Sequence, residues 1–232
     1  MTGSSAVLRV REPELMDDPA VDPREHDHVL GVLDRTNRFF GSDRALFRAV
    51  RRFGQIESIL DIGCGGGGFL RFLRERTADR PPRLMGLDFS DFVVERARRG
   101  HDDGFEFIRA DARAIPLADA SVDLVTSSLF LHHFDPPDIV VILREAARVA
   151  RRGIVISDLT RSRLGWLVTW IVTRTVTRNR LFRTDGPRSV RAAFTPAELE
   201  DLLSAAGLVG ASVRRTFPFR MIASWARDGA TA

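Results

Sequence analysis

Apolar and polar residues alternate in blocks through the middle of this 232-residue chain. Short apolar runs typical of buried strands occupy residues 56–62, 83–88, 104–108, 122–128 and 153–158. Stretches with apolar residues at helical spacing separate them, over residues 67–77, 90–99 and 137–150. Strands that alternate with helices in this way predict a parallel sheet with helices on both faces.

Helical spacing of apolar residues also precedes this core, from Val29 to Phe53. A glycine-containing break at residues 41–43 divides the stretch into two expected helices, with Ser42 or Asp43 as the N-cap of the second. Residues 1–28 are rich in proline and aspartate and show little periodicity. We therefore expect an N-terminal arm that is partly mobile.

Helix-start signals appear again in the second half of the chain. Asp135 precedes two prolines and is expected to cap the helix that follows. Thr195 and Glu198 fit a capping box, and Gly207 indicates where that helix ends. Two final strands are expected over residues 208–216 and 219–226.

Residues 160–193 interrupt the alternation of strands and helices. Apolar residues in this segment recur at a spacing that suits one amphipathic helix, with Trp166 and Trp170 beside them. Arginines flank and interleave the apolar positions, namely Arg161, Arg163, Arg174, Arg178, Arg180 and Arg183. We expect an inserted lid, and an ordinary packing helix or a helix that lies on a membrane surface are the alternatives.

The chain length suits a single domain. We divide it into an arm with entrance helices (1–55), a core (56–159), the lid (160–193) and a last helix with terminal strands (194–232). No apolar run is long enough to span a bilayer, and the first residues lack the layout of a signal peptide. The one cysteine excludes an internal disulfide. We therefore expect a cytoplasmic protein.

The charge pattern adds little to this picture. The net charge is +4, and all 35 basic residues are arginine, because the sequence contains no lysine. These arginines are spread along the chain among aspartates and glutamates instead of forming one basic patch. We therefore expect no nucleic-acid partner.

The most informative stretch is a glycine-rich turn between a strand and a helix, at residues 59–70. Such a turn brings the backbone close to a bound nucleotide and points helix N–H groups at it. Gly63, Gly65 and Gly68 fit the dinucleotide pattern G-x-G-x-x-G, which leaves an NAD-dependent reductase as one interpretation. However, an acidic residue stands at or just beyond the end of three successive predicted strands. These residues are Asp61, Asp88 and Asp111.

The segments LDIGCGGG, MGLDFS and FIRADARAIPLADASVDLV resemble motifs of the class I S-adenosylmethionine (SAM) methyltransferases. The resemblance is close over about residues 56–160 and looser elsewhere. It implies a Rossmann-like α/β fold, with a seven-stranded sheet that is mostly parallel and contains one antiparallel strand. It also implies SAM as the cofactor.

The resemblance assigns parts of SAM to individual residues. The glycine loop would pass beneath the methionine portion, Asp61 would meet its ammonium group, and Asp88 would accept hydrogen bonds from the ribose hydroxyls. Asp111 would accept from the adenine amino group. The residues expected at the cofactor are Asp61, Gly63, Cys64, Gly65, Gly67, Asp88, Phe89, Asp111, Ala112, Ser128 and, from the entrance helix, Arg38.

His132 and His133 follow the fourth core strand, at the edge that would face the methyl group. Imidazole titrates near ~6.5, so either histidine is a candidate general base. Cys64 lies inside the cofactor loop and is wrongly placed for a nucleophile. We expect no metal, because Asp135 and Asp138 are spaced for helix entry.

We expect methyl transfer to a small, largely apolar acceptor, by preference O-methylation of a phenolic or polyketide-type metabolite. SDLTRSRLGW and DGPRSVRAAFTPAEL resemble methyltransferases that accompany type III polyketide synthases. The alternatives are a C-methyltransferase of quinone biosynthesis, an NAD-dependent reductase and a protein that binds SAM without catalysis. The expected partner is an aromatic or lipidic small molecule, with membrane-surface contact and an oligomer left open.

Overall fold

A seven-stranded sheet forms the centre of the molecule in a computed structural model that describes residues 8–18 and 20–227. Its strands follow the order β3-β2-β1-β4-β5-β7-β6. The strands are β1 (Ser58–Ile62), β2 (Arg83–Asp88), β3 (Phe105–Arg109), β4 (Val122–Ser128), β5 (Ala150–Leu159), β6 (Ser212–Thr216) and β7 (Arg220–Ala226). The first five pair in parallel, whereas β7 runs antiparallel to both β5 and β6. The predicted mixed sheet is confirmed.

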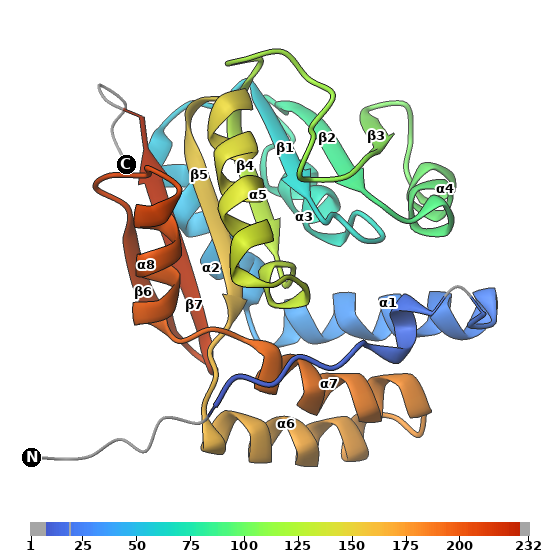
Figure 1. Ribbon diagram of the computed structural model, residues 1–232. Helices are drawn as coiled ribbons and strands as arrows, with labels where there is room; N and C mark the ends of the chain where they lie inside the picture. The colour runs from blue at the N-terminus through green and yellow to red at the C-terminus, as the bar shows by residue number, and fades with distance from the viewer. Residues whose placement is uncertain (1–7, 19, 228–232) are drawn as a thin grey trace, which may run out of the picture.

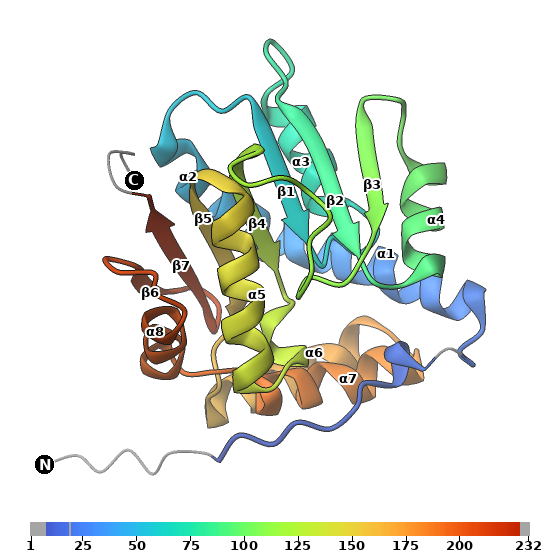
Figure 2. The same ribbon diagram turned by 45° about the horizontal axis from the view of Figure 1, so that its top comes forward.

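Helices cover both faces of this sheet (Figures 1 and 2). The helices are α1 (Pro23–Phe39), α2 (Ser42–Val50), α3 (Gly68–Arg76), α4 (Asp91–Gly100), α5 (Pro136–Val149), α6 (Arg163–Val176), α7 (Arg180–Ala192) and α8 (Pro196–Ala205), with short 3₁₀ turns η1 (Leu15–Asp17), η2 (Arg51–Phe53) and η3 (Leu131–His133). Helices α2, α3 and α4 contribute to one hydrophobic cluster, and α5 and α8 to another on the opposite face. None of the helices among residues 8–18 and 20–227 has both the length and the apolar content needed to cross a bilayer.

Strand β1 shows why the core strands read as continuous apolar runs. Its side chains point alternately to the two faces, so that Leu60 and Ile62 pack toward α5 and α8 while Ile59 packs toward α2, α3 and α4. All five residues are buried. A parallel strand covered on both faces cannot show the apolar–polar alternation of a half-exposed strand.

The segment after β5 forms two helices instead of the single predicted one. Asn179 accepts a hydrogen bond from the Phe182 backbone N–H and so caps α7, which packs against α6. Pro187 lies inside α7 and Gly186 precedes it, and these residues hid the helix in the sequence pattern. Figure 1 shows α6 as the outermost layer of this pair, below the sheet.

The N-terminal segment, predicted as a partly mobile arm, contacts α7 in its described part, which leaves out residues 1–7 and 19. Val10 donates a backbone hydrogen bond to Arg191 at 3.1 Å. The N–H groups of Leu15 and Met16 donate to the Asp185 carboxylate at 2.8 and 3.0 Å. Residues 8–18 therefore lie along α7, as Figure 1 also shows.

The structure bears out some of the helix-cap predictions and contradicts others. Gly41, with φ +74°, is the N-cap of α2, so the prediction of Ser42 or Asp43 was wrong. Asp135 does stand at the N-cap of α5, but its side chain makes no capping bond and pairs with two arginines of the N-terminal segment. The capping box of Thr195 and Glu198 at α8 is confirmed.

Candidate functional site

Asp61, next to the last residue of strand β1, is a buried carboxylate that lacks a cationic partner among the described residues. It is 2% exposed and accepts a hydrogen bond from Thr126 Oγ1 at 2.7 Å. Burial, with help from the nearby carboxylates of Asp43 and Asp88, raises the pKa of Asp61 to about 7 against the opposing Thr126 bond. The site thus contains concentrated negative charge that a bound cation would stabilise.

The glycine loop after β1 adopts the left-handed conformation three times, at Gly63 (φ +65°), Gly65 (φ +52°) and Gly67 (φ +75°). A side chain at Gly63 would also overlap the ring of Phe130. Helix α1 covers the loop, with Leu30 near Gly65. Phe130 and Leu30 therefore pack against the loop, and only glycine fits its backbone at these positions.

Asp88 joins the glycine loop to the end of β2. Its Oδ2 accepts from the Gly65 N–H at 3.0 Å and its Oδ1 from the Ser90 N–H at 3.1 Å. Burial raises its pKa, against these backbone bonds. A carboxylate has about four acceptor positions, so Asp88 can still accept hydrogen bonds from a ligand. The adjacent Phe89 ring is 67% exposed, which leaves its surface open for contact.

Asp111 lies beyond β3 on the same edge and is already paired with Arg113, whose Nη2 lies 2.7 Å from Asp111 Oδ2. This bond lowers the pKa of Asp111. The neighbouring Ala112 is buried at 4% exposure. Asp111 thus has one arginine beside it, and its role toward adenine stays a prediction.

Cys64 fills space inside the loop. Its side chain packs against the position of Gly86 on β2, where a Cβ would come within 2.7 Å of the sulfur. Burial and the carboxylates of Asp88 and Asp61 raise the pKa of the thiol. A protonated, buried thiol suits the predicted role of a small loop residue and not that of a nucleophile.

Two predicted cofactor residues have surroundings that the sequence did not indicate. Arg38 on α1 pairs with Glu75 on α3 at 2.6 Å, near the surface. The predicted bond from Arg38 to the cofactor stays a prediction. Ser128 ends β4, half-buried, and lies opposite Ser157 in the sheet register.

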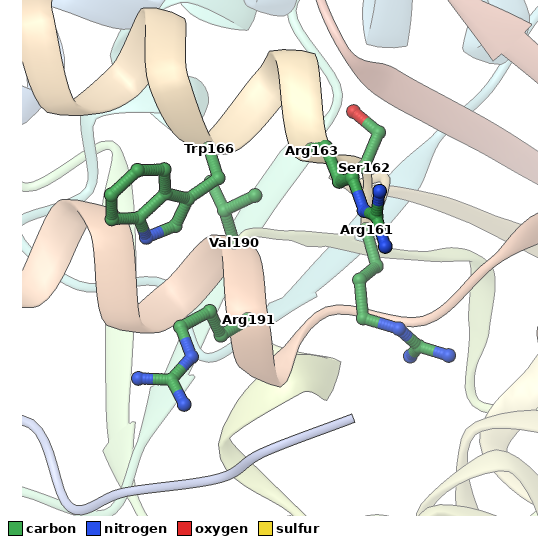
Figure 3. Close-up of a pocket in the computed structure, with 6 residues that line it drawn as sticks. All are labelled: Arg161, Ser162, Arg163, Trp166, Val190 and Arg191. Atoms are coloured by element: carbon green, nitrogen blue, oxygen red, sulfur yellow. The ribbon is translucent and has the colours of Figure 1, made fainter. Parts of the chain in front are cut away.

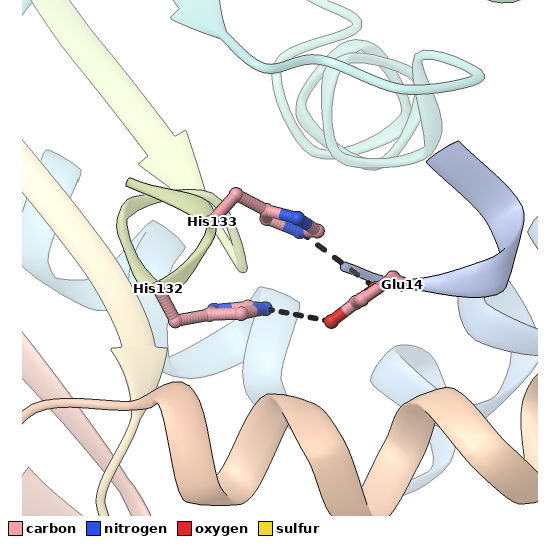
Figure 4. A group of neighbouring side chains, drawn as sticks. All are labelled: Glu14, His132 and His133. Atoms are coloured by element: carbon pink, nitrogen blue, oxygen red, sulfur yellow. Dashed lines mark ion pairs between the residues drawn. The ribbon is translucent and has the colours of Figure 1, made fainter. Parts of the chain in front are cut away.

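His132 is clamped between two carboxylates. Its Nδ1 donates to Asp158 Oδ1 at 2.7 Å, and its Nε2 lies 3.7 Å from Glu14 Oε1 (Figure 4). Burial opposes a charged imidazole, but Asp158 and Glu14 outweigh it and raise the pKa of His132 to about 10. Burial likewise opposes ionisation of Glu14, yet the two histidines and Ser189 lower its pKa to about 2. His132 is thus protonated at neutral pH, and these contacts do not favour it as a general base.

His133 is the better placed of the two candidate bases. Its ring centroid lies 4.4 Å from that of His132, its side chain is 25% exposed, and its Nε2 lies 4.0 Å from Glu14 Oε2 (Figure 4). The two histidines border a hollow of about 20 Å³ closed by residues 11–14 and Ala192, which is room for about one water molecule.

Glu14 is the functional-site residue that the sequence did not reveal. It belongs to the segment expected to be a mobile arm, 118 positions before His132 (132 minus 14). Ligating atoms of Glu14, His132 and His133 lie within 4.8 Å of one another, a spacing that also suits a metal ion. By contrast, Asp135 pairs with Arg11 and Asp138 with Arg113.

Comparison with known proteins decides between the interpretations of this edge. Residues 59–153 match a family model described as a methyltransferase domain. This match, together with the named methyltransferase relatives, supports a class I SAM-dependent methyltransferase domain. It disfavours NAD-dependent reduction and supports SAM as the cofactor.

Relatives of this methyltransferase domain include two bacterial O-methyltransferases. Fatty-acid O-methyltransferase of Mycolicibacterium smegmatis is 32% identical over 157 residues, which are 63% of this chain and 55% of the relative. The 27-O-demethylrifamycin SV methyltransferase of Amycolatopsis mediterranei is 39% identical over 102 residues, 42% of this chain and 36% of that protein. The matched region thus spans about half or less of either relative.

A solved methyltransferase structure shares the whole fold. The plantazolicin methyltransferase BpumL, in complex with a desmethyl analogue and S-adenosylhomocysteine (SAH), has a TM-score of 0.65 at 16% identity. The match covers 91% of this chain and 92% of that one. At this identity the likeness concerns the fold.

The residues present in the methyltransferase domain fit SAM. Asp61 is a buried carboxylate with a raised pKa and no described arginine or histidine against it, and SAM brings an ammonium group and a sulfonium. The glycine loop, with its three left-handed glycines, follows it directly in the chain. Asp88 retains acceptor capacity where the ribose hydroxyls are expected. These assignments of individual residues stay predictions.

Proposed function

We propose that this protein transfers a methyl group from SAM to an oxygen atom of a small, largely apolar acceptor, preferably a phenolic or polyketide-type compound. The observation that carries the proposal is the convergence of the strand-end carboxylates Asp61 and Asp88, the glycine loop and His133 at one edge of the sheet. Similarity to two proteins named as O-methyltransferases supports oxygen as the accepting atom.

In this proposal the protein orients SAM and the acceptor, and it removes one proton from the acceptor. SAM supplies a methyl group on a positively charged sulfur. Asp61 holds the ammonium end and Asp88 the ribose, while His133 accepts the proton of the attacking hydroxyl. A phenol titrates near ~10, like tyrosine, and a neighbouring positive charge favours its ionised form. Alignment of the reacting atoms can supply several of the ~7–11 kcal/mol available from ideal orientation.

His132 and Glu14 act in this scheme by holding the site together. The Asp158 bond fixes the His132 ring, and the charged ring attracts Glu14. Residues 8–18 thereby lie over the two histidines. A closed site excludes water, which otherwise competes for the proton and screens the charges.

A carboxylic acid is a second candidate acceptor. The fatty-acid O-methyltransferase similarity favours it. Such an acceptor is already ionised at neutral pH and needs no base. Ring-carbon methylation of a quinone precursor and SAM binding without catalysis are the remaining alternatives.

We also propose that the protein works in the cytoplasm and that its 160–193 segment contacts a membrane surface. The single cysteine suits a reducing compartment. The exposed apolar side chains of α6 support membrane contact.

Turnover of acceptor panels tests the proposed function. The purified protein is incubated with methyl-labelled SAM and, separately, with alkylated phenols, quinols and fatty acids, and the products are identified by mass spectrometry. We expect labelled methyl ethers from phenols, and His133→Gln lowers kcat by ~100-fold while Arg99→Gln, at an exposed residue of α4, does not. Methyl esters alone, with His133→Gln unaffected, would support the carboxylic acid instead, and absence of any product in a protein that binds SAH contradicts catalysis.

A further inference from the structure

Helix α6 turns its large apolar side chains away from the protein. Its buried residues are Gly165 and Thr173. The side of α6 that meets α7 presents small groups. The methyl groups of Thr169 and Thr173 lie against Gly186 of α7, so closely that a Cβ at Gly186 would contact them. The exposed residues are Leu164 (60%), Trp166 (36%), Leu167 (45%), Trp170 (39%), Ile171 (46%) and Val176 (56%). An amphipathic helix of a water-exposed surface has the opposite arrangement.

Four of these exposed residues form a stripe along one side of α6. Leu164, Leu167 and Ile171 stand at spacings of three and four residues, which places them on one side of a helix, and Trp170 adjoins them. Scattered apolar residues on a protein surface are common, whereas a contiguous apolar stripe is typical of an interaction site. Figure 1 shows that α6 is the outer layer here, with α7 between it and the sheet.

Arginines surround the stripe without neutralising carboxylates. Arg163, Arg174, Arg178 and Arg180 are exposed, and none of them pairs with a carboxylate in the part of the chain that the structure describes. Residues 159–184 contain no aspartate or glutamate. Many arginines elsewhere are paired, as Arg83 is with Glu106 and Arg148 with Glu145. The positive charge beside the stripe is therefore available to an anionic partner.

A hollow at the N-terminal end of α6 adds a place for a polar group. It measures about 250 Å³ and is lined by Arg161, Ser162, Arg163, Trp166, Val190 and Arg191. Figure 3 shows Trp166 and Arg163 of α6 facing the same space as Arg191 of α7. An indole and a guanidinium side by side suit the boundary between acyl chains and charged headgroups.

We propose that α6 docks on the surface of a membrane that contains anionic lipids. The apolar stripe lies at the boundary of headgroups and acyl chains, and the four unneutralised arginines contact lipid phosphates. Charge complementarity selects this occupant, because an apolar stripe with positive charge at both ends and no acid fits a negative surface. The inference deepens the proposed function, since it brings the enzyme to a lipidic acceptor, but docking itself requires no methyl transfer.

Vesicle co-sedimentation tests the docking without SAM or acceptor. The full chain is mixed with vesicles of phosphatidylcholine alone or of phosphatidylcholine with phosphatidylglycerol. We expect binding to the anionic vesicles that is at least ~10-fold stronger than to the neutral ones and that weakens in high salt. Leu167→Glu with Ile171→Glu should abolish it, whereas Val209→Glu, at a residue 86% exposed outside α6, should leave it unchanged.

A second pair of variants tests how much the arginine charges beside the stripe contribute to vesicle binding. Arg178→Gln with Arg180→Gln should weaken binding to anionic vesicles ~5-fold or more, and Arg214→Gln with Arg215→Gln, also exposed but on β6, should not. SAH titration of every variant checks that the domain is folded, so failure of docking is separate from failure of catalysis. Absence of binding to anionic vesicles, or equal binding by the Leu167 and Ile171 variant, overturns the proposal. Loss of a dimer in that variant without any vesicle binding would assign the stripe to a second copy of the chain.

Discussion

His132 donates its Nδ1 hydrogen to Asp158 Oδ1 at 2.7 Å, and both side chains are almost completely buried. The His132 backbone N–H also donates to the other carboxylate oxygen, at 3.2 Å. This double contact fixes the turn after β4 against β5. The Asp158 carboxylate also keeps the His132 imidazole protonated, and the protonated ring attracts Glu14. Asp158 on β5 thereby helps to hold the N-terminal segment over the candidate site.

Removal of the His132 charge should cost stability in a pH-dependent way. The folded-state pKa of His132, about 10, exceeds the unfolded value near ~6.5. Its stabilising contribution is therefore fully present below ~6.5 and is lost as the pH rises through about 10. We expect His132→Asn to lower the unfolding free energy by about 3–5 kcal/mol at pH 6, the range for breaking a buried ion pair.

Denaturant unfolding of the wild type and His132→Asn at pH 6 and at pH 9.5 measures this effect. The difference between the two proteins should shrink at the higher pH. Asp27→Asn, in an exposed ion pair with Arg96, serves as the control and should change stability by less than about 1 kcal/mol. A His132 effect that is the same at both pH values contradicts the charged state assigned to the imidazole.

Gly63→Ala should destabilise the protein more than Gly41→Ala. Both glycines have a positive φ, +65° and +74°, so both substitutions incur left-handed strain of roughly 1–2 kcal/mol. Only the Gly63 substitution also forces a methyl group into the Phe130 ring, because the space around Gly41 is open. Chemical denaturation of both variants compares the costs, and Phe130→Ala should partly rescue Gly63→Ala. Equal losses would mean that the Phe130 contact is easily relieved.

Cofactor affinity should rise with pH through the titration of Asp61. Its pKa is about 7, so at pH 6 most molecules carry a neutral acid that attracts an ammonium group weakly. We expect SAH affinity to increase several-fold from pH 6 to pH 7.5, at most about tenfold per pH unit. Calorimetric titration measures it, and Asp61→Asn should bind weakly with little pH dependence. A wild-type affinity that is constant over this range contradicts a role for the Asp61 charge.

Asp88→Ala should weaken SAH binding by about 1–3 kcal/mol, the scale of a lost buried hydrogen bond. The carboxylate also accepts from Gly65, so the glycine loop loses a support as well. Asp91→Ala provides the control, since the side chain of Asp91 is 75% exposed and pairs with Arg109. Titration calorimetry of both variants distinguishes them, and an unchanged affinity in Asp88→Ala would refute its ribose role.

Local patterns in the sequence were sufficient to predict the sheet and the glycine loop. Strands such as 83–88 are short apolar runs, and a glycine turn has a distinctive composition, so both are visible without knowledge of the rest of the chain. The antiparallel strand came from the family resemblance instead. Helix α7 escaped prediction because Gly186 and Pro187 mask a helix that tertiary packing stabilises.

The surroundings of the site residues could not be predicted in the same way. Glu14 reaches His132 from a segment without periodicity, because its partner is 118 positions away (132 minus 14). Arg38 forms an ion pair with Glu75 on a neighbouring helix. Such pairings depend on how helices are placed in space, whereas local spacing predicts only which face of a helix a residue occupies.

A crystal structure of the protein with SAH bound tests the cofactor site directly. We predict that the ribose hydroxyls lie within hydrogen-bond distance of the Asp88 carboxylate, with the adenine beside Phe89 and the ammonium group toward Asp61. An adenosine bound anywhere other than this edge of β1, β2 and β3 would contradict the assignment of the site.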